Sequence, residues 1–318
     1  MDSHFPDSAE MIEILTILAP VFLLMAMGYA LGHTRLFNEE HASALIAFVW
    51  YLAIPALLFR FMASRPLPID ELLLIASYYC AMYMVYVLAV FAGRFIFKQS
   101  GDEQGMFAFA SCFSNAGFVG IPILGGVFGD EGVRLLLILL SFHSLTLLPI
   151  TSMIVYRHRT GKLSPAGVFA SLKDNPIILA LLIGLGWSMI GLPYPDWLDR
   201  ILALPAAAAA PVGLFAVGLS LTGVKLAGDL PQAGLGTIIK LLIMPVTAYL
   251  VGRYVFDLPL QWLGVVTLFA ALPAGLIPYT FALKEQLAPR RVASMILISI
   301  TLAPITLFIV MWFLGVGG

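Results

Sequence analysis

Ten long apolar segments run along the 318-residue chain, separated by short joints that carry most of its acidic residues. A helix needs about 20 apolar residues to cross a bilayer, so each segment predicts one membrane span. The predicted spans cover residues 14–31, 42–62, 71–93, 105–128, 134–156, 175–195, 200–223, 232–254, 259–283 and 291–315. The short joints leave no room for a soluble domain. The pattern therefore predicts an all-α polytopic membrane protein.

The fourth of these segments contains an irregular stretch, SCFSNAGFVGIPIL at residues 111–124. Polar residues, glycines and a proline lie together in its middle, at a depth where lipid offers no hydrogen bonds. Backbone groups released by such a break must face protein or a water-filled cavity. The ninth segment has a comparable stretch, ALPAGLIPYTFAL at residues 271–283. We therefore predict two broken helices in the protein interior.

The two halves of the chain resemble each other at an offset of about 158 residues, because six short motifs recur in the same order. For example, AGRFIF (92–97) corresponds to VGRYVF (251–256). Each half holds five predicted spans, an odd number, so the second half must enter the membrane from the opposite face. This pattern predicts an inverted repeat, with halves 1–158 and 175–318 joined by a cytoplasmic loop, 159–174. Many secondary transporters have this architecture, with the binding site at matching broken segments.

Composition agrees with the membrane prediction, since 61% of the residues are hydrophobic and 11% are charged, against about 25% charged in soluble domains. Five Lys and Arg residues lie on the side of the N-terminus and twelve on the other, which accounts for all 17. The positive-inside rule then places both termini outside. The chain has no basic tract, so no nucleic-acid partner is expected. Cys80 and Cys112 form no metal-ligand cluster, and neither a metal nor a cofactor is expected.

The two broken segments carry the candidate site, because the N-termini of helices attract anions. Two half-helices that begin near the bilayer midplane would present backbone N–H groups to a carboxylate. The amide of Asn115 would add a side-chain donor or acceptor. The candidate substrate-binding residues are Ser114, Asn115, Gly117, Pro122, His143, Pro273, Gly275, Pro278 and Tyr279.

The polar candidates also have ordinary structural explanations. Asn115 could bond a neighbouring helix, although its place directly before the break favours contact with a substrate. A serine such as Ser114 can bond its own backbone. His143 lies deep in the fifth span and is either a proton or substrate group or a neutral contact between helices. The hydroxyl of Tyr279 serves either a ligand or a partner helix.

Other residues within the spans have interfacial or packing interpretations. Lys240, about two turns into the eighth span, is expected to snorkel to the cytoplasmic surface, and the alternative is that it attracts anions to the inner mouth. Arg60 is expected at the outer boundary of the second span. Gly117 and Gly275 either let two backbones approach closely or pack as ordinary small residues. The aromatic residues expected at span ends or in packing contacts are Trp50, Tyr51, Trp187, Tyr194, Trp197 and Trp312.

Three motifs resemble those of the auxin efflux carrier family, whose plant members are the PIN transporters. They are SNAGFVGIPIL in the fourth span, PVGLFAVGLSL (211–221) in the seventh and ALPAGLIPYTFALKEQ (271–286) in the ninth. The resemblance covers nearly the whole chain. It implies the fold of bile-acid sodium symporters and sodium/proton antiporters, in which spans four and nine are broken and cross. The substrate-contacting asparagine of the family motif corresponds to Asn115.

The resemblance also implies a division of labour between spans. Spans 1, 2, 6 and 7 would form a scaffold that dimerises, and spans 3–5 and 8–10 would form a mobile transport domain. The implied function is secondary transport of small organic anions, such as malonate, malate or auxin-like weak acids, across a bacterial inner membrane by an elevator mechanism. The implied partners are the anion, H+ or Na+ as coupling ion, membrane lipid and a second copy of the chain.

Several alternatives remain open at this point. A sodium-coupled symporter of the bile-acid type is the nearest. A cation/proton antiporter is disfavoured because the Asp and Glu residues lie at span ends or in joints. An enzyme is disfavoured because the chain has no nucleophile–base pair or phosphate loop. The central loop of about 19 residues and the presence of Ala274 after Pro273 depart from the plant pattern and argue against auxin itself as substrate.

Overall fold

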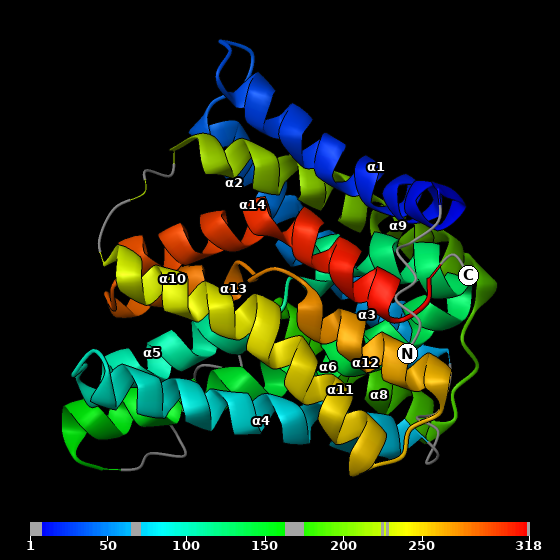
Figure 1. Cartoon of the computed structure of the whole chain (residues 1–318). Coiled ribbons are helices and arrows are strands. Elements are labelled where there is room, and N and C mark those ends of the chain that lie inside the picture. The colour runs from blue at the N-terminus through cyan, green and yellow to red at the C-terminus, as the bar shows by residue number, and fades with distance from the viewer. Residues whose placement is uncertain (1–7, 65–70, 163–174, 224–225, 227–228, 317–318) are drawn as a thin grey trace.

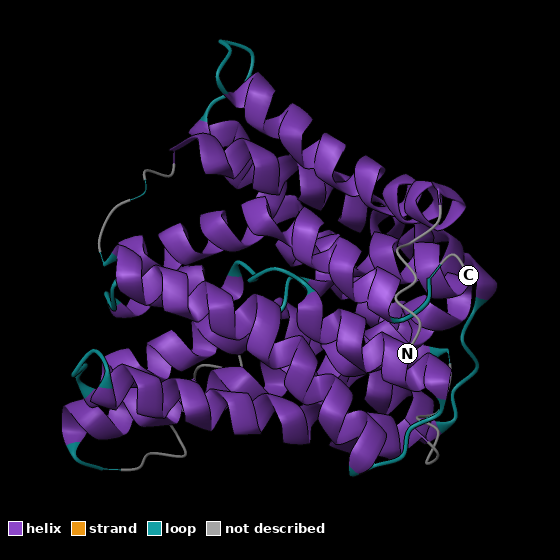
Figure 2. Ribbon diagram, in the orientation of Figure 1, coloured by secondary structure: helices purple, strands orange, loops and turns teal. Residues whose placement is uncertain are grey.

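The structure, a computed structural model, describes residues 8–64, 71–162, 175–223, 226 and 229–316, which form helices joined by loops (Figure 1, Figure 2). The helices are α1 (Ser8–Gly32), α2 (Glu39–Phe48), α3 (Ile54–Ala63), α4 (Leu72–Phe95), α5 (Gly101–Cys112), α6 (Ile121–Thr160), α8 (Pro176–Ile190), α9 (Asp196–Ser220), α10 (Leu230–Ile238), α11 (Met244–Tyr254), α12 (Leu260–Ala271), α13 (Ile277–Glu285) and α14 (Pro289–Phe313). Shorter segments are the π-helices η1 (Val49–Ala53), η3 (Ala116–Gly120) and η5 (Ile239–Ile243) and the 3-10 turn η4 (Leu221–Gly223). Residues 163–174 of the predicted connecting loop lie outside the described residues.

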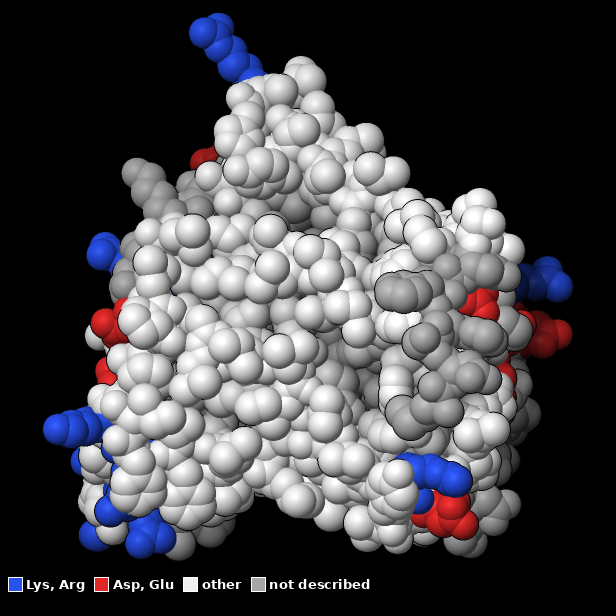
Figure 3. Space-filling model, viewed as in Figure 1, with Lys and Arg blue, Asp and Glu red and all other residues white. Residues whose placement is uncertain are grey.

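Seven helices in the described part of the chain are long and apolar enough to cross a membrane. They are Ser8–Gly32, Glu40–Ala63, Leu72–Phe95, Ala116–Thr160, Asp196–Ser220, Leu230–Tyr254 and Pro289–Phe313. Figure 3 shows charged residues mainly near the left and right margins of the molecule, with a broad uncharged band between them. The predicted class, an all-helical protein with several membrane-crossing helices, is confirmed, whereas the count of ten spans stays a prediction.

The helices divide the predicted fourth and fifth spans differently from the sequence pattern. The predicted span 105–128 is interrupted, because α5 ends at Cys112 and helical structure resumes only at Ala116. From there the chain stays helical through the whole of α6. Inside α6 the backbone leaves helical geometry at Gly129, with φ 62° and ψ −152°. Glycine adopts this conformation at little cost, so α6 changes direction where the sequence predicts a joint.

Local sequence explains several helix ends. The side chain of Asn38 accepts a hydrogen bond from the backbone N–H of His41 at 3.0 Å, and the Nδ1 atom of His41 accepts one from the N–H of Asn38. This capping box begins α2. Asn175 caps α8, with Pro176 at the first helical position, where its missing N–H is not needed. Gly191 ends α8 in the left-handed conformation, with φ 71°.

Two groups of helices are distinguished by their contacts. In the first group α1 packs against α9, and α3 packs against α8 and α9. In the second group α4 packs against α5 and α11, α10 against α14, and α11 against α12. Small residues bring α1 and α9 together, because a Cβ atom at Gly28 would overlap the carbonyl oxygen of Phe215. The segment η3 contacts α9, so the first broken helix lies where the two groups meet.

Candidate functional site

The two interrupted helices meet inside the protein. Residues 113–115 separate α5 from η3, and residues 272–276 separate α12 from α13. Leu272 leaves the helical conformation, with φ −58° and ψ 148°, as expected for the residue before a proline. Figure 1 shows the second break as an orange loop in the middle of the bundle, between α12 and α13.

The two breaks are joined by backbone hydrogen bonds. Ser114 and Ala274 pair as an isolated antiparallel β-bridge. Two hydrogen bonds complete the pairing, from the N–H of Asn115 to the carbonyl of Pro273 at 2.8 Å and from the N–H of Gly275 to the carbonyl of Phe113 at 3.0 Å. Each break therefore satisfies part of the backbone that the other leaves open, as a protein interior requires.

Side chains from two other helices satisfy the remaining N–H groups of the bridge. The N–H of Ser114 donates to Nε2 of His143 in α6 at 2.9 Å. The N–H of Ala274 donates to Oγ of Ser299 in α14 at 3.1 Å. Both side chains are completely buried. His143 thus acts as a hydrogen-bond acceptor for the backbone of the first break.

Lys240, in η5, lies behind the same bridge. Its Nζ donates to Oγ of Ser114 at 2.9 Å and to the carbonyl of Ala270 at 2.6 Å. The side chain is 0% exposed, so the expectation that it snorkels to the cytoplasmic surface is wrong. Its amine finds acceptors inside the protein, at the last turn of α12, and does not need to reach water.

A cavity of about 380 Å³ lies in front of the bridge. It is lined by Ser43, Ile46, Ala47, Trp50, Tyr51, Ile54, Phe113, Ser114, Asn115, Ala116, Gly117, Phe118, Leu140, Ser144, Ile177, Gly275, Leu276, Ile277 and Thr280. No Lys, Arg, Asp or Glu is among these lining residues. Nδ2 of Asn115 is buried and has no hydrogen-bond partner in the described part of the chain. The cavity is thus mainly apolar, with an unused amide donor at its wall.

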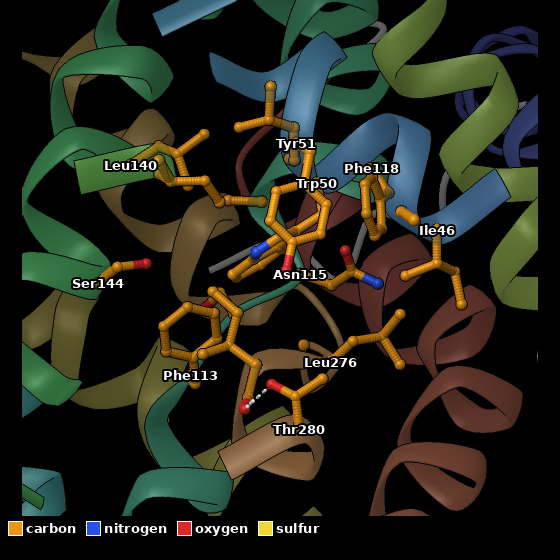
Figure 4. Close-up of a pocket in the computed structure, with 18 of the residues that line it drawn as sticks. Ile46, Trp50, Tyr51, Phe113, Asn115, Phe118, Leu140, Ser144, Leu276 and Thr280 are labelled. Atoms are coloured by element: carbon orange, nitrogen blue, oxygen red, sulfur yellow. Dashed lines mark hydrogen bonds between the residues drawn. The ribbon is translucent and has the colours of Figure 1, made fainter. Parts of the chain in front are cut away.

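Figure 4 shows how the wall is assembled. Trp50 and Tyr51 lie on one side, and Phe113 and Thr280 lie on the other (Figure 4). Asn115 lies between them in this view. A carboxylate held at Asn115 would therefore have aromatic and aliphatic surface around the rest of the molecule.

Four of the predicted site residues line this cavity: Ser114, Asn115, Gly117 and Gly275. A Cβ atom at Gly275 would lie 3.1 Å from the carbonyl oxygen of Ser114, so two backbones approach closely here. At Gly117 a Cβ atom would meet Ile54 alone, at 3.0 Å from Cδ1. The close approach at Gly117 is therefore to a side chain.

The other predicted site residues lie away from this wall or act through the backbone. His143 lies behind the bridge, and Pro273 contributes its carbonyl to the bridge. Tyr279 lines a neighbouring cavity of about 300 Å³, which shares four lining residues with the first: Ser43, Ile46, Leu276 and Thr280. Pro278 lies in the first turn of α13, where a missing N–H removes no helical hydrogen bond. Pro122 lies at the junction of η3 and α6, inside a continuous helical stretch.

Sequence interpretation missed several residues of the cavity wall. Trp50 and Tyr51 were expected at a span end or in packing contacts, but they face the cavity from η1. Their position in the middle of the predicted span 42–62 was a usable signal. Ser144 and Thr280 gave none, because single hydroxyl residues in apolar helices are common. Arg60 lies apart from the cavity and binds Asp199 through two hydrogen bonds of 2.8 and 2.9 Å.

The fold and the cavity define a class, a polytopic helical membrane protein with a cavity that no Lys, Arg, Asp or Glu lines, beside two interrupted helices. Within the described residues, no group of three or more His, Cys, Asp and Glu side chains could hold a metal ion. A family model described as "Membrane transport protein" matches residues 13–165 and 167–311. The chain belongs to this family, the auxin efflux carrier family, and is a membrane transporter.

Relatives from bacteria, archaea and plants match nearly the whole chain. A Rhizobium meliloti protein named "Putative malonate transporter" is 25% identical, over 93% of this chain and 94% of its own length. A protein of Methanothermobacter thermautotrophicus, named an uncharacterized transporter, is 29% identical over 90% of this chain and 94% of its own. Auxin efflux carrier component 8 of Arabidopsis thaliana is 22% identical over 93% and 96%. The family recognised from the motifs is thereby confirmed.

Proposed function

We propose that the protein is a secondary transporter of small organic anions, carboxylates such as malonate, malate or auxin-like weak acids. The proposal rests on the unpaired Nδ2 of Asn115 in the cavity at the two breaks. A buried donor without an acceptor is costly, so a ligand oxygen that reaches it gains binding free energy. A carboxylate supplies such an oxygen, and a malonate transporter among the similar proteins is consistent with this class of ligand.

Two helix starts at the cavity add to the preference for an anion. The first residue of η3, Ala116, and the first residue of α13, Ile277, both line the cavity. The first N–H groups of a helix lack partners within the helix and carry partial positive charge. A carboxylate beside Asn115 would therefore be near two positive helix ends, with Ser114, Gly117 and the bridge at its side. Pro278 would fix the start of α13, and Pro122 would lie further along the first helix, at the junction of η3 and α6.

The division of the cavity wall supports an elevator mechanism. Trp50 of η1 and Ile177 of α8 belong to the first helix group, and Asn115 and Thr280 belong to the second. We assign the first group, predicted spans 1, 2, 6 and 7, as scaffold and the second, spans 3–5 and 8–10, as transport domain. Sliding of the second group along the first would open the cavity to one membrane face and then to the other.

An inverted repeat of ten spans is part of the same proposal. The bridge has matching supports in the two halves, His143 for Ser114 and Ser299 for Ala274. Each support comes from the predicted span that follows the broken one. The proposal further includes termini on the outer side of a bacterial inner membrane and a homodimer of the scaffold, both carried over from the charge bias or the family.

Transport by purified protein in liposomes tests the proposal. Uptake of labelled malonate, malate and indole-3-acetate should be saturable for at least one of them and should show counterflow. Asn115→Ala and the isosteric Asn115→Asp should abolish this uptake, with thermal unfolding and monodispersity as checks of folding. Unchanged uptake kinetics in a folded Asn115 variant would show that Asn115 is not part of the substrate site. Linear flux without counterflow would indicate a channel.

A thermal-shift screen separates the coupling alternatives. Binding stabilises a protein by mass action, by about 2.7 kcal/mol at a ligand concentration of 100 Kd. The three carboxylates are screened in choline and in sodium buffers between about pH 5 and 8, and at least one of them should raise the unfolding temperature. Stabilisation that appears in sodium alone would favour a sodium-coupled symporter. Strong pH dependence would favour H+ as the coupling ion.

A further inference from the structure

Lys240 is an unusual charge in the described residues, because it is buried without a carboxylate. Glu71, the buried acid of this part of the chain, forms an ion pair with Arg134. Lys240 is absent from every ion pair among the described residues, and its two hydrogen bonds go to a hydroxyl and a backbone carbonyl. Its charge is therefore balanced by dipoles alone.

Lys240 is connected to the cavity wall through a hydrogen bond to Ser114. Ser114 lines the cavity and accepts the hydrogen bond from Nζ. Oγ of Ser114 in turn donates to the carbonyl of Phe269 at 3.0 Å. The next residue, Asn115, carries the unpaired amide. One residue, Ser114, thus separates the ammonium group from the cavity wall at the predicted anion position.

A buried ammonium group without a carboxylate is costly in free energy, and an anion bound nearby would lower this cost. A charge in the interior of a membrane protein is expensive and is usually paired. The carbonyl of Ala270 lies in the last turn of α12, where the helix dipole is negative and offsets part of the charge. A full negative charge in the cavity would offset more, because two charges at a given separation interact more strongly in a protein interior than in water.

We propose that Lys240 is a positioning residue of the anion site: acting through Ser114, its ammonium group makes the cavity prefer a carboxylate to the neutral amide of the same shape. The inference rests on the proposed function, since it assumes a carboxylate at Asn115. Lys240 would then supply the positive charge that none of the residues lining the cavity provides. It also gives Ser114 two roles, as partner of the second break and as the link to Lys240.

The test compares each carboxylate with its neutral analogue: malonate with malonamide, malate with malamide and indole-3-acetate with indole-3-acetamide. Affinities are measured for the wild type, Lys240→Met and Lys240→Arg, in sodium-free buffer. Lys240→Met should weaken carboxylate binding roughly tenfold, as for charges separated by about 10 Å at an effective dielectric constant of about 20. Amide binding should change less than about twofold, and Lys240→Arg should keep the preference for the carboxylate.

Two further variants control this comparison. Lys284→Met makes the same substitution at an exposed lysine in the last turn of α13 and should leave both affinities unchanged. If Lys240→Met does not fold, Lys240→Gln keeps N–H donors for Ser114 and Ala270 without the charge, and the same outcomes apply to it.

Equal loss of carboxylate and amide binding would show a structural role for Lys240 and overturn the inference. So would unchanged carboxylate affinity in a folded Lys240 variant. A wild-type protein that binds none of the three carboxylates would overturn the proposed function and, with it, the inference. If the wild type binds one of the carboxylates and the Lys240 variants bind it equally well, the inference alone would be overturned.

Discussion

The two broken helices have similar backbones but different chemistry. At the first break, Asn115 lines the cavity and its buried Nδ2 has no hydrogen-bond partner among the described residues. Oγ of Ser114 accepts a hydrogen bond from the amine of Lys240. At the second break, the residues opposite them are Ala274 and Pro273, which contribute backbone groups alone. Two breaks can therefore share a backbone framework while one of them alone contributes polar side chains to the cavity wall.

The supports of the two breaks differ in the same way. His143 supports the first break with an aromatic ring that lies against Phe113, with ring centroids 4.4 Å apart. Ser299 supports the second with a hydroxyl that also donates to the carbonyl of Ile296 at 2.9 Å. Removing the first support should therefore disturb packing and hydrogen bonding, and removing the second should disturb hydrogen bonding alone.

The largest effect is expected at the glycine of the second break. In Gly275→Val the new side chain would push the backbone of Ser114 and the ring of Phe113 away, because even a Cβ atom would lie 3.1 Å and 2.8 Å from them. The two hydrogen bonds that join the breaks would be lost with them. We expect a loss of about 3–5 kcal/mol in the free energy of unfolding, measured by thermal unfolding in detergent. Near wild-type stability would contradict the close approach of the two breaks.

His143→Ala should come next. It removes the acceptor of the Ser114 N–H and leaves a space beside Phe113, so we expect a loss of about 2–4 kcal/mol. His143→Gln keeps an acceptor oxygen and should recover part of the loss. If both variants change the affinity for the carboxylates or its pH dependence but leave stability unchanged, His143 would be a proton or substrate group rather than a support.

Ser299→Ala should have a smaller effect, about 1–2 kcal/mol, because a buried N–H loses its acceptor but no large space is left. Thr301→Val, two residues further along α14 on an exposed position, is the matched control and should be close to neutral. A Ser299 effect as large as that of His143→Ala would mean that the two supports are equivalent, contrary to the comparison.

The smallest effect is expected for Gly117→Ala, the counterpart of the change at Gly275. Its Cβ atom would meet the Cδ1 atom of Ile54, the flexible end of a side chain. Alanine also favours helical conformations over glycine, so we expect a change within about 1 kcal/mol. A loss comparable to that of Gly275→Val would indicate a second close backbone contact at the first break.

Much of the interrupted architecture was predictable from local sequence. Pro273 forces the residue before it out of the helix. Asn115 lies among polar residues, glycines and a proline whose hydrogen-bonding groups lipid cannot pair. Both breaks were therefore predicted within a few residues. Trp50 packs against the core, as one of the two expectations had it. The cavity that Trp50 and Tyr51 line was not foreseen, because aromatic residues occur at membrane interfaces, in packing contacts and in cavity walls alike. Lys240 was misassigned because hydropathy gives depth along a helix but not the direction in which a side chain points.

The sequence by itself determined the membrane class and the two breaks, since these follow from composition, hydrophobic period and the conformational limits of proline and glycine. The family was recognised from the resemblance of three motifs. The tertiary structure alone decided that Ser114 faces Ala274, that His143 and Ser299 complete their hydrogen bonds, and that Lys240 lies behind the cavity. These contacts join residues far apart in the chain. Burial forces each polar group to find a partner, but which partner it finds depends on how the helices pack.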